Sequence, residues 1–245
     1  MTGNTHRAGG MLCSVVGFAL LKEQGLLLPE INPCIQWLVM YPFCYWGSTA
    51  SDLDHNWESC PTKDYPSWLL NKMLHITRPI DKILDKHLSE KRKKSNIFYM
   101  ISHIFNAHHR SWQTHSDLTL IVMLYFVSRV LNGGYAYLGA FENAVVSLIV
   151  MGLSLGIIAH FILDLITPEG INLVICKVIN TILGLFNIKL KLPEKLHLVP
   201  HSSFFATGNA WEQFINKLLK IGTVMSILYM IYCLIEPYIP YTISI

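Results

Sequence analysis

Long segments without ionisable side chains are the feature that most constrains this chain of 245 residues. A helix needs about 20 mostly apolar residues to cross the hydrocarbon core of a bilayer. Four segments carry no charged side chain and a fifth, shorter one is also apolar, at residues 31–50, 118–128, 144–159, 221–235 and 8–21. The sequence therefore predicts an all-α, polytopic membrane bundle of about five apolar helices, which forms a single membrane-embedded domain over residues 1–245.

The overall composition agrees with a membrane location. Hydrophobic residues make up 52% of the chain and charged residues 14%, against about 25% charged residues in an average soluble domain. The alternative is a soluble helical bundle with a large core, but such a bundle needs more charge on its surface. The first residues are polar and no cleavage site follows, so we expect no removal of a secretory signal.

The basic residues predict the orientation in the membrane. Every Lys and Arg except Lys22 and Arg129 lies in residues 1–7, 52–116 or 168–220. Loops rich in Lys and Arg stay in the cytoplasm, so we expect these loops and the N-terminus on the cytoplasmic side of a bacterial inner membrane. Residues 171–186 are apolar but contain Lys177, and we interpret them as an interfacial or re-entrant helix; a true span would move the following residues to the other side.

A basic insert at residues 56–96 mixes apolar and charged side chains. This mixture predicts amphipathic helices that lie on the membrane surface, with membrane lipids as partners. The run Lys91-Arg92-Lys93-Lys94 either faces anionic lipid headgroups or is a solvated run that sets the topology. It lacks interleaved aromatic residues, so no specific nucleic acid is expected to bind it.

Histidines and acidic residues cluster where the predicted helices reach the cytoplasmic face. The candidate metal ligands are His6, Asp54, His109, His115, His160 and Asp164. His160 and Asp164 are four residues apart, which places both side chains on one helix face. Ionisable groups at membrane depth are costly and usually have a partner or a function. Imidazole and carboxylate groups together ligate divalent metals such as zinc; the alternative is a His–Asp pair that only joins two helices.

Three further residues are candidates for catalysis: Asp52, Arg110 and Glu212. Asp52 and Asp54 lie at a predicted helix C-terminus, where a cation would offset their unfavourable charge. Arg110 suits bidentate contact with phosphate, or it only marks the cytoplasmic side. Glu212 is a candidate ligand or general base, or a carboxylate that stabilises a helix N-terminus.

Several motifs occur in an order typical of a known family. They are Met1-Thr2-Gly3-x-Thr5-His6-Arg7-x-Gly9-Gly10, Asp52-Leu53-Asp54-His55, His109-Arg110-x-x-x-Thr114-His115-Ser116, Ala159-His160-x-x-x-Asp164-x-x-Thr167-x-x-Gly170 and Thr207-Gly208-x-x-x-Glu212. Together they resemble the YdjM-type bacterial inner-membrane proteins, which are usually described as membrane-bound metal-dependent hydrolases. That family is distantly similar to zinc-dependent phospholipases C and single-strand nucleases, whose His-x-x-x-Asp metal pair is matched by His160 and Asp164.

The leading hypothesis is thus a membrane-bound metal-dependent hydrolase that acts on a phosphoester or lipid-linked substrate, such as a phospholipid, at the cytoplasmic face. Its cofactor would be a divalent metal, with zinc preferred. Two alternatives stay open. One is a non-enzymatic membrane protein with a structural metal site, and the other is a metal or ion transporter, since intramembrane ionisable groups also mark ion paths.

Overall fold

The computed structural model describes residues 3–54, 65–89, 96–99, 114–135, 137–167, 170–186, 188–198 and 208–235. The chain divides into two compact units. The first unit consists of Met1–Ser48, Leu120–Gly170 and His197–Ile245, and the second of Thr49–Thr119 and Ile171–Leu196.

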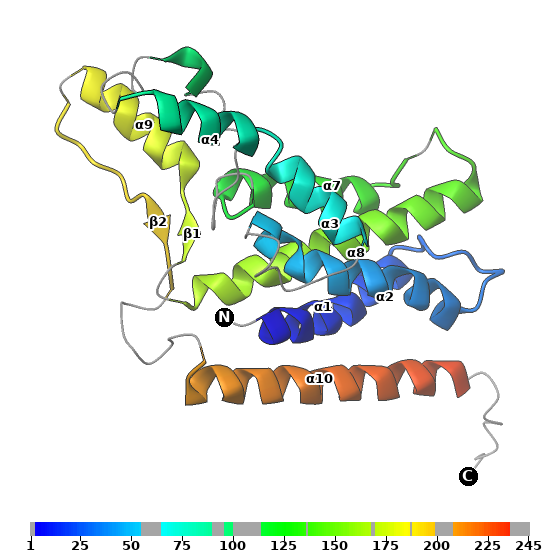
Figure 1. The fold of residues 1–245 in the computed structure, drawn as a ribbon. Coiled ribbons are helices and arrows are strands. Elements are labelled where there is room, and N and C mark those ends of the chain that lie inside the picture. The colour runs from blue at the N-terminus through cyan, green and yellow to red at the C-terminus, as the bar shows by residue number, and fades with distance from the viewer. Residues whose placement is uncertain are drawn as a thin grey trace, which may run out of the picture. The chain divides into compact units, whose positions relative to one another are not determined.

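The first unit is built from long helices (Figure 1). They are α1 Gly3–Glu23, α2 Pro33–Ala50, α7 Asp117–Leu131, α8 Ala140–Leu165 and α10 Ala210–Ile235, although the last residues of α2 and the first of α7 belong to the second unit. Helix α1 packs against both α8 and α10. The hydrophobic core of the first unit consists of Phe18, Leu21, Trp37, Met40, Val130, Leu148, Met151 and Met230.

Glycines allow α1, α2 and α8 to approach one another closely. A Cβ atom at Gly156 of α8 would lie 2.3 Å from the carbonyl oxygen of Cys44 in α2. A Cβ atom at Gly10 of α1 would lie 2.6 Å from the Cβ of Ser48, again in α2. Small residues at helix contacts let the backbones pack tightly, as in membrane bundles. This packing brings the first turns of α1, the end of α2 and the end of α8 together.

The all-α class is confirmed, and each of the five predicted apolar segments lies in a helix, apart from residues 31 and 32, which precede α2. Within the described part of the chain, two helices are long and apolar enough to cross a membrane, Ala140–Leu165 and Ala210–Tyr232. The predicted number of about five spans is therefore not confirmed. Helix α9, Val174–Leu185, has 12 residues and measures about 18 Å, too short to cross a hydrocarbon core of about 30 Å alone.

The second unit contains shorter elements. They are the 3-10 helix η1 Ser51–Asp54, α3 Tyr65–Leu74, α4 Arg78–His87, strand β1 Ile171–Asn172, α9 and strand β2 Lys195–Leu196. The strands are antiparallel, with Ile171 opposite Leu196. The predicted insert contains helices α3 and α4, while Lys91-Arg92-Lys93-Lys94 lies outside the described residues.

Candidate metal centre

Three of the predicted ligands come together inside the first unit. His6 lies in the first turn of α1, and His160 and Asp164 lie in the last turns of α8. On α8 they continue a row with a spacing of four that starts at Gly152 and Gly156, so they share the face that packs against α1 and α2. All three residues are at most 1% exposed.

The two imidazoles meet the two oxygens of one carboxylate. His6 Nε2 lies 3.7 Å from Asp164 Oδ1, and His160 Nε2 lies 3.5 Å from Asp164 Oδ2. The two imidazole rings stack with centroids 3.7 Å apart and planes inclined by 15°. Two imidazolium cations stacked so closely would repel each other. The geometry therefore favours at least one neutral imidazole, which is the form that binds metals.

A backbone carbonyl sets the tautomer of His160. The Nδ1 atom lies 2.8 Å from the carbonyl oxygen of Ser48 in α2. A carbonyl can only accept, so Nδ1 carries the hydrogen and donates it. In neutral His160 the lone pair is then on Nε2, which faces the Asp164 carboxylate. The Nε2 lone pair and the carboxylate oxygen repel each other, and a metal cation or a proton between them relieves this repulsion. Metal-ligating histidines are commonly oriented by a hydrogen bond such as the one to Ser48.

The spacing of these atoms fits a shared cation. Charge-assisted N–H···O hydrogen bonds measure about 2.7–2.9 Å, shorter than both imidazole–carboxylate distances. Two ligands of a tetrahedral zinc ion lie about 3.4 Å apart, given bonds of about 2.0–2.1 Å. One ligand atom from each of His6, His160 and Asp164 lies within 4.8 Å of the other two. These three residues can therefore hold a metal ion.

Glu212 joins the same unit through a buried hydrogen bond. The hydroxyl of Thr5 in α1 donates to Glu212 Oε1 over 2.9 Å, and the backbone N–H of Gly208 donates to Oε2. Glu212 is 4% exposed in the first turn of α10. The bond thus fixes the start of α10 beside the residue that precedes His6.

Replacing Thr5 with valine is expected to lower the free energy of unfolding by about 1–3 kcal/mol, because the shape is kept while a buried carboxylate loses a donor. Thermal unfolding in detergent measures the effect. Thr181→Val is the matched control, since that hydroxyl donates to the Lys177 carbonyl at an exposed position and should change stability by about 0.5 kcal/mol or less. Equal effects of both substitutions would show that the Thr5–Glu212 bond adds nothing.

Two other predicted residues meet in the second unit. His115 Nε2 lies 3.7 Å from Asp52 Oδ1, and the backbone oxygen of His115 accepts from Asn172 N at 3.1 Å. The strand β1 therefore holds the His115 backbone in place. Of the remaining candidates, the side chain of Asp54 and all of His109 and Arg110 lie outside the described residues.

Comparison with known proteins decides the family. The model of the YdjM inner membrane protein family matches residues 1–239. The chain belongs to the YdjM family. No curated protein and no solved structure matches it. Membership of the YdjM family confirms the resemblance inferred from the motifs, and the family description agrees with an inner-membrane location.

Two groups that position residues of the centre in this YdjM family member were not predicted from the sequence. Ser48 contributes a backbone carbonyl, for which no side-chain pattern exists. Thr5 was part of the first motif but was given no role. Thr5 could have been identified from its position, because it is a polar residue directly before the candidate ligand His6 in a helix that then becomes apolar.

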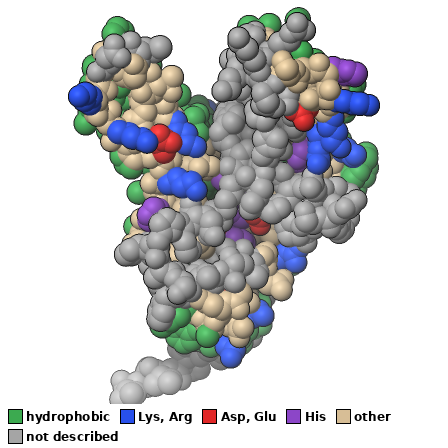
Figure 2. Space-filling view, turned by 60° about the vertical axis from the view of Figure 1, so that its left-hand side comes forward, with side chains coloured by type: hydrophobic (Ala, Val, Ile, Leu, Met, Phe, Trp, Pro, Cys, Tyr) green, Lys and Arg blue, Asp and Glu red, His purple; other side chains and the backbone are tan. Residues whose placement is uncertain are grey.

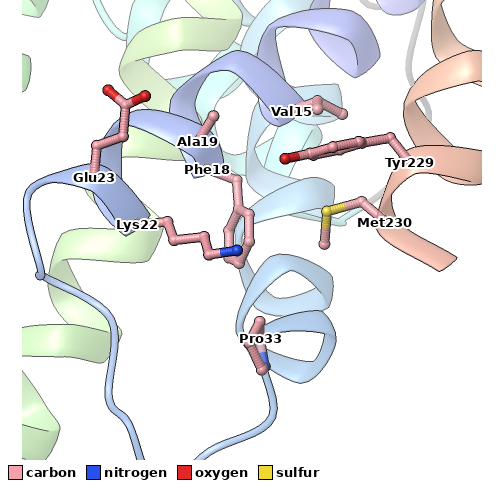
Figure 3. A pocket seen from close by; sticks show the side chains of 8 residues that line it. All are labelled: Val15, Phe18, Ala19, Lys22, Glu23, Pro33, Tyr229 and Met230. Atoms are coloured by element: carbon pink, nitrogen blue, oxygen red, sulfur yellow. The ribbon is translucent and has the colours of Figure 1, made fainter. Parts of the chain in front are cut away.

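A pocket of about 340 Å³ lies at the other end of α1 and does not contain the metal ligands (Figure 3). Its walls are mainly apolar, and the side chain of Lys22 extends into it beside Phe18 while that of Glu23 points away. Lys22 and His6 are both in α1, so the helical rise separates them by about 24 Å. This pocket is therefore distinct from the candidate metal centre.

Proposed function

We propose that this YdjM family member is a multi-pass, membrane-bound metal-dependent hydrolase that acts on a phosphoester or lipid-linked substrate at the cytoplasmic face. The observation that carries the proposal is the buried group of His6, His160 and Asp164, in which two imidazoles face one carboxylate. Membrane embedding is supported by α10, whose apolar side chains are largely exposed, among them Ile221, Val224 and Met225. Exposed apolar surface of this extent requires a lipid or protein environment.

The charge of the ligand set suits an anionic substrate. A bound divalent ion such as zinc would supply Lewis acidity and lower the pKa of a coordinated water. Two neutral imidazoles and one carboxylate contribute a single negative charge, so the loaded centre keeps a positive charge that attracts a phosphoester. The Ser48 carbonyl holds His160 in the required tautomer, and the sequence-based assignment of Arg110 as an anion-binding group extends the same proposal.

Glu212 fits a positioning role better than that of a proton acceptor. Both of its carboxylate oxygens accept hydrogen bonds, one from Thr5 and one from Gly208. These bonds stabilise the ionised carboxylate and hold α10 against α1. The sequence-based assignment of Asp52 as a general base stays a prediction; its carboxylate oxygen Oδ1 lies 3.7 Å from His115 Nε2 in the second unit.

The hydrolase proposal is tested with the full chain purified in detergent and loaded with zinc. We expect release of the leaving group from a chromogenic phosphodiester, and a rate at least about 100-fold lower for Asp164→Asn, because removal of one charge weakens the centre and its hold on the metal. Glu30→Gln is the control, since Glu30 is exposed in the loop before α2. No turnover by the zinc-loaded protein on phosphodiester, phosphomonoester and phospholipid substrates would contradict the proposal.

A structural metal site is the second candidate, and the burial of the centre favours it. His6, His160 and Asp164 are each at most 1% exposed, as expected for a site without an open coordination position. In that case zinc would raise the unfolding temperature and support no turnover. A hydrolytic centre is instead expected to show both effects.

A further inference from the structure

The α9 arm is a well-defined structure on the second unit; it consists of residues 171–196, from β1 through α9 to β2. Asp117 caps the N-terminus of α9, where its two carboxylate oxygens accept from the backbone N–H groups of Val174 and Ile175 at 2.9 and 3.3 Å. A carboxylate at a helix N-terminus is favoured by the helix dipole. The start of α9 is thus fixed by side-chain hydrogen bonds in addition to the two-stranded sheet.

Asn180 holds the segment that returns from α9 to β2. Its Oδ1 accepts from Leu192 N at 2.7 Å, and its Nδ2 donates to Leu192 O at 2.9 Å. The same Nδ2 donates to Glu194 Oε1 at 3.3 Å, and Leu173 N donates to Glu194 O at 3.0 Å. The returning segment therefore keeps a fixed position against the helix.

A basic pocket of about 680 Å³ lies between α9 and this segment. It is lined by Lys177, Lys191, Leu192, Pro193, Glu194 and Lys195. Three ammonium groups outnumber one carboxylate, and that carboxylate already accepts from Asn180. On the face of the molecule drawn in Figure 2, basic side chains lie beside hydrophobic ones. The excess positive charge favours an anionic occupant.

Exposed apolar side chains accompany the basic pocket along the arm. They are Ile175, Val178, Ile179, Ile182, Phe186, Ile188 and Leu190. Phe186 is 72% exposed and Leu190 62%, which is unfavourable in water. Apolar side chains next to lysines are typical of elements that lie in the membrane interface, where the lysine stems extend to reach phosphate groups. A free phosphate would use the lysines alone and leave the apolar face uncovered.

We propose that the α9 arm binds an anionic phospholipid, with the headgroup phosphate in the pocket of Lys177, Lys191 and Lys195 and the acyl chains against exposed apolar side chains of the arm. With 12 residues, α9 is too short to cross the hydrocarbon core alone, and its exposed apolar side chains suit the interface. The cytoplasmic leaflet carries anionic lipids, and the distribution of basic residues predicts that this segment lies on the cytoplasmic side. The site belongs to the second unit alone and uses none of the ligands of the metal centre.

The test is a titration of the full chain in a non-ionic detergent, read out by native mass spectrometry. Short-chain phosphatidylglycerol is expected to bind more tightly than phosphatidylcholine with the same acyl chains. Lys191→Gln should weaken phosphatidylglycerol binding about fivefold, since one lysine near a phosphate contributes about 1 kcal/mol, and weaken phosphatidylcholine binding less, because the choline cation offsets the charge of its phosphate. Lys217→Gln, at an exposed position of α10, is the charge-matched control and should change neither lipid.

Two further measurements separate a lipid site from a simple anion site. Phe186→Ser should weaken the binding of both lipids, because it removes apolar surface without changing charge. Water-soluble glycerol phosphate should not displace phosphatidylglycerol. The proposal is overturned if the two lipids bind equally well, if Lys191→Gln has no more effect than Lys217→Gln, or if glycerol phosphate displaces the lipid.

Discussion

Replacing His160 with alanine is expected to lower the zinc affinity of the purified protein at least about tenfold, as loss of a ligand or of its orienting partner does in other metal sites. His160 supplies an Nε2 atom that the Ser48 carbonyl directs at Asp164, and alanine at this position offers no ligand atom. Metal content per chain after dialysis against a graded zinc buffer, determined by elemental mass spectrometry, measures the loss.

Two companion variants make this result specific. His87→Ala removes an exposed histidine at the end of α4 and should leave the metal content unchanged. Asp164→Asn keeps the side-chain shape, so a loss of zinc without a loss of the folded state would assign the effect to ligation and exclude a packing defect. Unchanged zinc affinity in both His160→Ala and Asp164→Asn would contradict the assignment of the centre.

Replacing Gly156 with alanine is expected to destabilise the first unit by about 3 kcal/mol, because the added Cβ overpacks the helix contact. That atom would lie 2.3 Å from Cys44 O and 2.7 Å from Ser48 N, and backbone atoms cannot move aside as a flexible side chain can. Zinc content should fall as well, since the carbonyl that orients His160 belongs to Ser48. Thermal unfolding in detergent and elemental analysis measure the two effects.

Gly184→Ala is the matched control for this substitution. Gly184 lies in α9, and among the described residues no atom outside its own helix backbone and chain neighbours would lie within 4 Å of an added Cβ. The same chemical change should therefore raise stability, by up to about 1 kcal/mol, through helix propensity. Similar destabilisation by both substitutions would show that the close approach of α2 and α8 does not limit stability.

The pattern of charge and hydropathy predicted the fold class and the most important part of the centre. Uncharged segments locate the helices because burying a charge in an apolar layer is costly, and helical spacing places His160 and Asp164 on one face. His6 was selected because antiparallel helices return distant residues to the same end of a bundle. Its stacking on the His160 ring depends on the Gly10 and Gly156 contacts, which no single-sequence pattern specifies.

Other features could not be derived from the sequence, for identifiable physical reasons. The hydrogen bond to the Ser48 carbonyl involves a backbone group that every residue carries, so its partner is chosen by packing alone. The same holds for Asn180, whose pairing with Leu192 depends on where the returning segment lies. The predicted number of about five spans stays unconfirmed: among the described residues two helices are long and apolar enough to cross a membrane, and helix length and composition alone do not show which apolar helices lie in lipid.

Zinc K-edge X-ray absorption spectroscopy of the protein purified from membranes would show directly which atoms bind the metal. We expect nitrogen and oxygen ligands at about 2.0–2.2 Å, with outer-shell imidazole scattering that decreases in His160→Ala. Cys13, Cys34 and Cys44 are free thiols in α1 and α2 of the same unit, so they are competing ligands. A spectrum dominated by sulfur at about 2.3 Å, or an imidazole signal that His160→Ala leaves unchanged, would contradict a centre formed by His6, His160 and Asp164.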